Sequence, residues 1–404
     1  MFLEKEGKLI YSYDGETVCI EAWGKDALRV RATKNRSFTG RDWALEAKDA
    51  HAGEVEIFED PSAKGGAFAN MYEGTDTSYG KITNGKLHAV IDSGSVITFY
   101  HEDGRVLLKE HFRRLRDEES MPLNIMGREY SNGVGDNFRI VTRFVARKGE
   151  KIFGMGQYQQ HELDLKGCML ELAQRNSQVS VPFYLSSIGY GFLWNNPGVG
   201  QVMFANNGTE WVTESGKEID YLVIAGDTPA EIEENYMTLT GKPPMMPEYG
   251  MGFWQCKLRY WNQEQLLSVA RKYKELGVPL DVIVVDFFHW TKQGEFKFDP
   301  KYWPDVPGMC RELKEMGIQV VVSVWPTVDI YSENFEEMKE KGYLVRTEHG
   351  VPLTMLCGGN EVFFDATNPD ARTYVWEKIK KNYYDQGAKL FWLDVAEPEY
   401  SVYD

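Results

Sequence analysis

Two carboxylates beside one apolar run are the residues of this sequence best suited to chemistry. The run 389–393 is followed by Asp394, and Glu397 comes three residues later. A buried, ionised aspartate costs free energy unless it is solvated, paired or used in a reaction. Carboxylates in such places act as nucleophiles, as general acids or bases, or as cation ligands. The stretch 389–400 is therefore the first candidate for a functional site.

A third carboxylate, Asp286, ends another apolar run and lies among aromatic residues in the sequence. Together with Asp394 and Glu397 it forms a predicted acidic cluster, set among Trp254, Phe287, Phe288, Trp290, Trp325 and Trp392. Carboxylates beside aromatic side chains suit either sugar chemistry or metal binding. A metal site needs more ligands in one place, and His289 is the only histidine near this set. We therefore expect no metal and no cofactor.

Strands and helices alternate through residues 248–404 and would position these side chains. Apolar strands are expected near 250–255 and at 281–286, 319–325 and 389–394. Between them we expect helices beginning after Asn262, at 308–316, at 333–341 and after Asn368; in the first of these, Leu266, Ala270, Tyr273 and Leu276 would form the buried face. Continuous apolar strands alternating with amphipathic helices specify a parallel sheet covered by helices.

Polar or aromatic residues end the expected strands, namely Gln255, Asp286, Trp325 and Asp394. In a (β/α)8 barrel this is the face that carries the active site. A doubly wound sheet also binds ligands at its strand C-termini, so this point does not separate the two folds. No glycine-rich phosphate loop follows any of the strands, which counts against nucleotide binding.

The first part of the chain has a different pattern. Short alternating β-branched segments broken by Gly, Asn and Asp predict an antiparallel β-sandwich, with strands at 18–22, 28–32, 87–91 and 95–100. Phe153-Gly154-Met155-Gly156-Gln157 is interpreted as a tight turn, because no helix follows it as a dinucleotide loop requires. Residues 179–186 and 189–196 predict a hairpin. A closing helix is expected after Thr228, with Ile232, Tyr236 and Leu239 on its apolar face.

Three prolines, Pro243, Pro244 and Pro247, mark the expected domain boundary. We expect residues 1–245 to form the β-sandwich with its closing helix. Residues 246–404 would form four β/α units. The predicted fold is thus a sandwich followed by the first half of a (β/α)8 barrel.

Composition excludes several classes of partner. Lys and Arg number 45 against 61 Asp and Glu, so the net charge of −16 argues against nucleic acid and anionic membrane surfaces as partners. The five cysteines are scattered without a CxxC pair, which disfavours a disulfide framework or a zinc site. No signal peptide is visible, and a cytoplasmic location is the expectation. The sequence leaves a homo-oligomer open.

Several motifs, in this order, resemble glycoside hydrolase family 31, the retaining α-glycosidases. They are Phe153-Gly154-Met155-Gly156-Gln157, Val181-Pro182-Phe183-Tyr184-Leu185-Ser186, Val285-Asp286-Phe287-Phe288-His289-Trp290, Phe298-Asp299-Pro300, Pro304-Asp305, Phe364-Asp365-Ala366-Thr367-Asn368-Pro369 and Trp392-Leu393-Asp394-Val395-Ala396-Glu397-Pro398. Each motif is weak alone, but their joint occurrence is a strong signal. The resemblance implies a galactose-mutarotase-like N-terminal domain, a catalytic (β/α)8 barrel and an α-linked oligosaccharide or glycoside as substrate.

The resemblance also implies roles for the acidic and aromatic residues. Asp394 would be the catalytic nucleophile, and Glu397 would support its surroundings. Asp286 would accept hydrogen bonds from sugar hydroxyls in the glycone pocket. Other substrate-binding positions would be Phe287, Phe288, Trp325, Trp392 and Trp254. The tryptophans could equally be ordinary barrel filling, and Glu397 could merely cap the next turn.

The bulky pair Phe287-Phe288 resembles α-xylosidases, in which little space remains for a C6 hydroxymethyl group. α-Xylosidase is therefore the first expectation, and α-glucosidase the second. Residues 248–404 are too few for a (β/α)8 barrel, which takes roughly 250 residues. In the family the general acid/base lies on a later strand, so it is not in this chain, and we expect this truncated chain to be inactive by itself. A non-catalytic carbohydrate-binding protein and an α-glucan lyase remain as alternatives.

Overall fold

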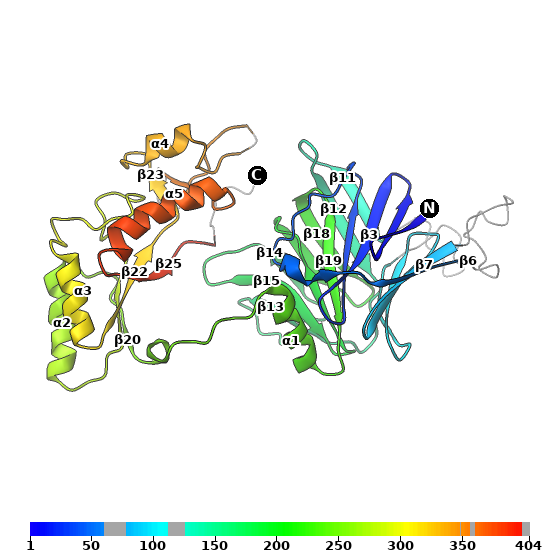
Figure 1. Ribbon diagram of the computed structural model, residues 1–404, viewed down its shortest axis with the longest axis horizontal. Coiled ribbons are helices and arrows are strands. Elements are labelled where there is room, and N and C mark those ends of the chain that lie inside the picture. The colour runs from blue at the N-terminus through cyan, green and yellow to red at the C-terminus, as the bar shows by residue number, and fades with distance from the viewer. Residues whose placement is uncertain (60–77, 112–125, 348, 356–359, 398–404) are drawn as a thin grey trace. The chain divides into compact units, whose positions relative to one another are not determined.

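The structure, a computed structural model, describes residues 1–59, 78–111, 126–347, 349–355 and 360–397. Within these residues the chain divides into two compact units, one made of 1–173 and 177–243 and the other of 174–176 and 244–404 (Figure 1). No described helix is long and apolar enough to cross a lipid bilayer.

The first unit is a β-sandwich built mainly from one large antiparallel sheet. Its strand order is β1-β2-β3-β4-β19-β16-β15-β13, with β5 beside β3. The strands are β1 (Phe2–Lys5), β2 (Lys8–Tyr13), β3 (Glu16–Trp23), β4 (Ala27–Thr33), β5 (Ala50–His51), β13 (Ile152–Gln157), β15 (Val179–Ser186), β16 (Tyr190–Trp194) and β19 (Ile219–Ala225).

Two smaller antiparallel sheets complete this unit. One has the order β10-β9-β8-β7-β6 and contains β6 (Glu54–Glu59), β7 (Ser78–Asn84), β8 (Leu87–Ile91), β9 (Ile97–His101) and β10 (Val106–Lys109). The other has the order β11-β12-β18-β17-β14 and contains β11 (Arg128–Asn132), β12 (Phe138–Phe144), β14 (Met169–Leu172), β17 (Gly200–Phe204) and β18 (Thr209–Gly216). A short 3-10 helix, η1 (Ala47–Asp49), precedes β5.

The closing helix α1 (Pro229–Thr240) begins where its sequence predicts. The Thr228 side chain accepts a hydrogen bond from the Glu231 N–H, and the Glu231 carboxylate accepts one from the Asp227 N–H. Ile232 and Leu239 of α1 pack against the large sheet in a cluster of buried residues that includes Leu222 and Ile224 of β19. Because the other face of β19 belongs to the sandwich core, this strand is buried on both faces. Short alternating segments are typical of half-buried strands, so this strand departs from the expectation for the sandwich.

The Gly154-Met155-Gly156 segment corrects a second prediction, because it is not a tight turn. It lies inside β13, which pairs with β15, and the register shifts between Gly154 and Gly156. All three residues have positive φ, at +116°, +70° and +91°. An added Cβ at Gly156 would overlap the carbonyl oxygen of Val179 on the paired strand. These glycines therefore permit a β-bulge.

We expect Gly156→Ala to destabilise the sandwich by more than Gly167→Ala does. Gly167 has the same backbone conformation, with φ +92°, but open space around its Cα. The control should cost about 1–2 kcal/mol from backbone strain alone, and Gly156→Ala should add the overlap with Val179. Urea unfolding of both variants measures the difference. Equal losses in the free energy of unfolding would mean that a small shift of the backbone relieves the overlap with Val179.

The second unit contains a parallel sheet in the order β20-β21-β22-β25, formed by β20 (Trp254–Gln255), β21 (Val282–Val285), β22 (Gln319–Val324) and β25 (Leu390–Leu393). A short 3-10 helix, η2 (Glu248–Met251), precedes β20. Between the strands lie α2 (Gln263–Glu275), α3 (Val306–Glu315), α4 (Phe335–Glu340), α5 (Pro369–Ile379) and a π-helical turn, η3 (Lys380–Tyr384). Within the described residues the sheet is open, with β20 and β25 at its edges, so the barrel is partial.

α2 and α5 begin at the caps that the sequence indicates, Asn262 and Asn368, whose side chains accept hydrogen bonds from backbone N–H groups in the first turn of each helix. α3 begins earlier than the expected residue 308, at Val306, with Asp305 as its cap. Leu276 corrects the predicted buried face of α2, because its side chain is 63% exposed and Leu267 is buried instead. The first expected strand is also shorter than predicted, since 248–251 form η2. A two-stranded antiparallel pair, β23 (Thr327–Asp329) with β24 (Glu361–Phe363), was not predicted.

The two faces of the parallel sheet differ. Ile283, Val285, Val320, Val322 and Val324 pack with residues of α2, α3 and α5 in the main apolar core of this unit. The opposite face holds a smaller cluster of Val282, Val284 and Val321, with Tyr249 and Leu390 packed against it. Side chains alternate along a strand, so the position of each site residue on these faces follows from the register.

Candidate functional site

Asp286 and Asp394 lie on the same face and at the same edge of the parallel sheet. Asp286 follows β21 and continues the alternation of Val282 and Val284, while Asp394 follows β25 and continues that of Leu390 and Trp392. The Asp394 N–H donates to the Val324 carbonyl at 3.1 Å, so the ladder between β22 and β25 extends to this residue. Both carboxylates therefore lie at the C-terminal edge, on the face opposite α2, α3 and α5.

Asp394 is held by a tryptophan from the neighbouring strand. The Trp325 Nε1–H donates to Asp394 Oδ2 at 3.1 Å, and both residues are half-buried. Val395, the next residue, has φ +57°. The left-handed conformation is costly for a β-branched side chain and occurs mostly where function demands it. Nothing in the sequence predicts this backbone conformation, because valine does not favour positive φ.

Asp286 has two hydrogen-bond donors. The Phe287 N–H donates to Asp286 Oδ1 at 2.8 Å, and the Cys256 thiol donates to Asp286 Oδ2 at 3.4 Å. Desolvation, with the neighbouring Asp286 charge, raises the pKa of Cys256 to about 11. The thiol therefore stays protonated near neutral pH and keeps its donor. Cys256 was not among the predicted site residues, and only the pairing of β20 with β21 brings it here.

The predicted aromatic residues form two groups. Phe287 stacks on Trp325 with ring centroids 5.2 Å apart and contacts Phe288 at 4.4 Å, so these three rings lie beside the carboxylates. Trp254 and Trp392 form an edge-to-face pair at 6.5 Å. Trp254 is paired in register with Val282, which places it farther from the C-terminal edge than Asp286. The structure thus brings Phe287, Phe288 and Trp325 to the carboxylates more directly than Trp254.

Phe288 and Glu397 complete the predicted set. Phe288 is 53% exposed and has φ +61°, a strained conformation for a bulky residue. The Arg259 guanidinium lies 5.5 Å from its ring centroid. Glu397 is half-buried and makes no hydrogen bond or ion pair with the part of the chain that the structure describes. Residues 398–400 of the stretch that first indicated function lie outside the described residues, so the capping alternative for Glu397 is not tested.

A cavity of about 700 Å³ also reaches Asp394 and Trp325. Its lining includes apolar residues of α5, β24 and β25, among them Val375, Phe363 and Phe391, together with residues 364–367. Phe391 belongs to the helix-covered side of the sheet, where packing rather than sugar recognition is expected. We therefore place the candidate sugar site on the other face, with Asp286 and Asp394. In the described residues no group of three or more potential ligands is arranged to hold a metal ion.

Two family models match the chain and together cover most of it. Residues 17–202 match the glycosyl hydrolase 31 N-terminal galactose mutarotase-like domain, and residues 243–404 match the glycosyl hydrolases family 31 TIM-barrel domain. The two matches agree with a sandwich followed by a partial barrel.

Similar proteins include characterised and uncharacterised members of one family. The chain is 44% identical over 413 residues to the uncharacterized family 31 glucosidase ORF2 of Pseudescherichia vulneris, covering 100% of this chain and 75% of that protein. It is 31% identical to alpha-xylosidase A of Aspergillus niger, covering 95% of this chain and 52% of that protein.

The fold is also similar to that of solved structures. The crystal structure of a GH31 alpha-xylosidase from a soil metagenome, complexed with xylose, matches with a TM-score of 0.90 and 49% identity. The match covers 100% of this chain and 59% of that one. The chain thus spans between about half and three quarters of these relatives' lengths.

Proposed function

The chain belongs to family 31 of the glycosyl hydrolases, and from its site geometry we propose that it contributes the nucleophile half of a retaining α-xylosidase. The observation that supports this most is the placement of Asp394 and Asp286 on one face and one edge of the sheet, with β22 between their strands and Trp325 donating to Asp394. The two carboxylates have different surroundings. Both oxygens of Asp286 accept hydrogen bonds, one from the Phe287 N–H and one from the Cys256 thiol. Asp394 accepts one at Oδ2, and its Oδ1 accepts none from the described residues.

In the proposed reaction the free oxygen of Asp394 attacks the anomeric carbon. A C–O bond forms to the enzyme while the glycosidic C–O bond breaks, and a second carboxylic acid donates its proton to the leaving oxygen. Water then hydrolyses the glycosyl ester with net retention. The two carboxyl groups of a retaining enzyme lie about 5–5.5 Å apart. Asp286 would bind sugar hydroxyls, Glu397 would support the surroundings of Asp394, and the acid/base would come from outside residues 1–404.

Xylose is the proposed glycone because of the aromatic residues that follow Asp286. Phe287 stacks on Trp325, and Phe288 contacts Phe287, so bulky rings stand beside the carboxylates where a C6 hydroxymethyl group would need space. The second candidate is α-glucosidase, which the similarity to the uncharacterized family 31 glucosidase of Pseudescherichia vulneris favours. Two substrates that differ by one group the size of a hydroxymethyl are separated in kcat/KM by only about 10–200-fold, or about 1–3 kcal/mol.

The test compares kcat/KM for p-nitrophenyl α-xyloside and α-glucoside, with the protein expressed from its whole reading frame. We expect the xyloside to be preferred by about 10-fold or more, and NMR of the first product to show α-xylose. Phe288→Ala should reduce the preference, while Trp254→Phe, farther from the carboxylates, should leave it nearly unchanged. A faster reaction with the glucoside would overturn the choice of glycone.

The same comparison extends to residues 1–404 alone. We expect this polypeptide to bind xylose in isothermal titration without hydrolysing either substrate. If residues 1–404 alone hydrolyse either substrate, the proposal that the general acid/base lies outside these residues is wrong. Binding without turnover by the whole-frame protein would instead favour a non-catalytic carbohydrate-binding protein.

A further inference from the structure

A buried histidine links the backbone of Asp286, just after β21, to the π-helical turn that precedes β25. His289 is 2% exposed, with Nδ1 2.9 Å from the Asp286 carbonyl oxygen and Nε2 2.9 Å from the Tyr383 hydroxyl. A carbonyl oxygen only accepts hydrogen bonds, so Nδ1 must carry the proton. Nε2 is then the acceptor, and Tyr383 donates to it. Both ring nitrogens are therefore used.

Tyr383, the second partner of His289, lies close in sequence to the strand that carries Asp394. Tyr383 lies in η3, the π-helical turn between α5 and β25, and β25 leads directly to Asp394. Single π-helical turns within helices are rare and frequently occur at functional sites. The Asp299 N–H donates to the His289 carbonyl at 2.7 Å, so the loop after Asp286 is also tied at its far end.

The surroundings of His289 keep its ring neutral. It packs against Trp290, Phe298 and Tyr383, with ring centroids 4.7, 4.9 and 5.5 Å away. Burial lowers the pKa of His289 to about 4, against a smaller opposing effect of its bond to the Asp286 carbonyl. The acidic groups nearest in the chain or through contacts are Asp286, Asp299 and, facing Tyr383, Glu295. The ring therefore keeps the same two hydrogen bonds between pH 5 and 8.

Asp286 needs such support because its own side-chain contacts are few. One donor is the N–H of the next residue, which moves with it, and the other is a thiol, a weak donor at 3.4 Å. The orientation of the carboxylate is therefore set mainly by its backbone. A carboxylate that is turned away from the sugar loses a charge-assisted hydrogen bond, which lowers affinity by about 10–100-fold.

We propose that His289 is a positioning residue that holds the Asp286 backbone against the turn preceding the Asp394 strand, and so fixes Asp286 for binding the sugar. This inference rests on the proposed glycosidase function. His289 does not touch the reacting atoms. It acts through Asp286, and its effect should be on sugar binding more than on the chemical step.

Two substitutions test the hydrogen bonds of the two ring nitrogens one at a time. The amide of His289→Asn can occupy the Nδ1 position and donate to the Asp286 carbonyl, whereas that of His289→Gln reaches the Nε2 position near Tyr383. In the whole-frame protein we expect His289→Asn, which loses only the bond to Tyr383, to raise KM for the α-xyloside by about 3–10-fold. We expect His289→Gln, which loses the bond to the Asp286 carbonyl, to raise KM by about 10–100-fold. Tyr383→Phe loses the same bond as His289→Asn and should show a similar rise. Melting temperatures of all three variants provide the control for stability.

A purely structural role predicts a different pattern. In that case the Asn and Gln variants would lose activity in proportion to their loss in melting temperature, and this result would overturn the proposal. An equal KM for the Asn and Gln variants would overturn it as well.

A second measurement does not depend on hydrolysis. In 15N-histidine-labelled protein, with seven histidines in these 404 residues, the His289 signal is identified by its loss in His289→Asn. We expect a neutral ring with the proton on Nδ1 at pH 6.5 and no titration above about pH 5. A proton on Nε2, or titration near pH 6.5, would overturn the inference. If the wild-type protein hydrolyses no α-glycoside, the proposed function fails, whereas this NMR result still decides whether His289 holds Asp286.

Discussion

Asp394→Asn is expected to lower kcat for α-xyloside hydrolysis by the whole-frame protein by at least about 10⁴-fold. An amide of the same shape cannot form the glycosyl ester, because its nitrogen and oxygen are poor nucleophiles. The Trp325 Nε1–H, which donates to Asp394 Oδ2 at 3.1 Å, can still donate to the amide oxygen of the variant. The geometry should therefore be preserved while the chemistry is lost.

Asp281→Asn is a matched control for this loss. Asp281 directly precedes β21, at the N-terminal end of the same sheet, and accepts a hydrogen bond from the Phe253 N–H at 3.0 Å. We expect this variant to keep kcat within a few-fold of wild type. Comparable losses at both positions would mean that any aspartate near this sheet is needed for folding, and Asp394 would lose its special role.

Chemical rescue separates a nucleophile from an acid that only orients the sugar. With Asp394→Gly and p-nitrophenyl α-xyloside, azide should enter the vacated space and attack the anomeric carbon. The C–N bond forms, p-nitrophenolate leaves, and the product is the β-xylosyl azide. Asp286→Gly should give no such product, because Asp286 is proposed to bind hydroxyls. Azide rescue at Asp286 in place of Asp394 would reverse the two assignments.

The elements of this protein could be predicted from the sequence where local chemistry determines them. Thr228, Asn262 and Asn368 each accept a backbone N–H at a helix start, as a short polar side chain before an amphipathic segment indicates. The apolar runs that became β21, β22 and β25 were likewise visible. The exposed Leu276 shows the limit, because helical spacing alone does not say where a buried face ends.

Features that depend on pairing between distant segments could not be predicted. The positive φ angles at Gly154, Met155 and Gly156 suggest a turn until the pairing of β13 with β15 shows a bulge. The hydrogen bonds of Cys256 and His289 join residues far apart in the sequence, 30 residues in one case and 94 in the other. Asp394 and Asp286 were candidates because each ends an apolar run, and the family motifs implied their roles, whereas the groups that hold them depend on how distant segments pair.

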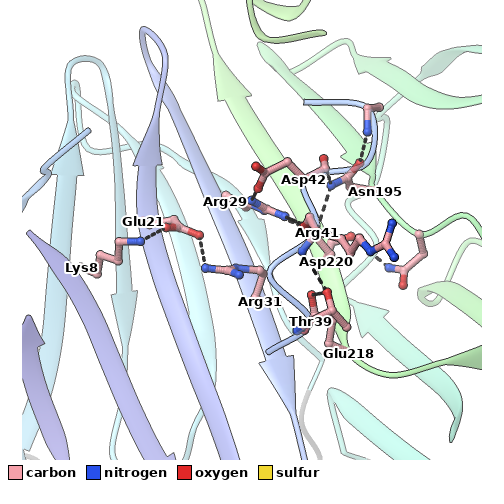
Figure 2. Close-up of polar contacts among 12 residues, drawn as sticks. Lys8, Glu21, Arg29, Arg31, Thr39, Arg41, Asp42, Asn195, Glu218 and Asp220 are labelled. Atoms are coloured by element: carbon pink, nitrogen blue, oxygen red, sulfur yellow. Dashed lines mark hydrogen bonds and ion pairs between the residues drawn. The ribbon is translucent and has the colours of Figure 1, made fainter. Parts of the chain in front are cut away.

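A buried ion pair in the sandwich is expected to control the stability of the first unit. Arg29 and Asp220 are both fully buried, and the guanidinium donates to both carboxylate oxygens, at 3.0 and 2.6 Å. Arg29 also donates to Asp42 and to the Arg41 carbonyl, and the Asn195 amide donates to Asp220. Figure 2 shows these groups converging between β4 and β19. Every hydrogen bond of the pair comes from this unit.

We expect Asp220→Ala to lower the free energy of unfolding of the first unit by about 3–5 kcal/mol, because it leaves the Arg29 charge buried without its main partner. Urea unfolding followed by circular dichroism measures the loss. Glu56→Gln is the control: its pair with Lys81, at 2.9 Å, is exposed and should contribute less than about 1 kcal/mol. The double variant Arg29→Met with Asp220→Leu removes both charges and should be more stable than Asp220→Ala. If the double variant is instead the less stable of the two, the convergence of Asp42, Arg41 and Asn195 on this pair contributes more than the pairing of opposite charges, and the network rather than the ion pair organises the centre of the sheet.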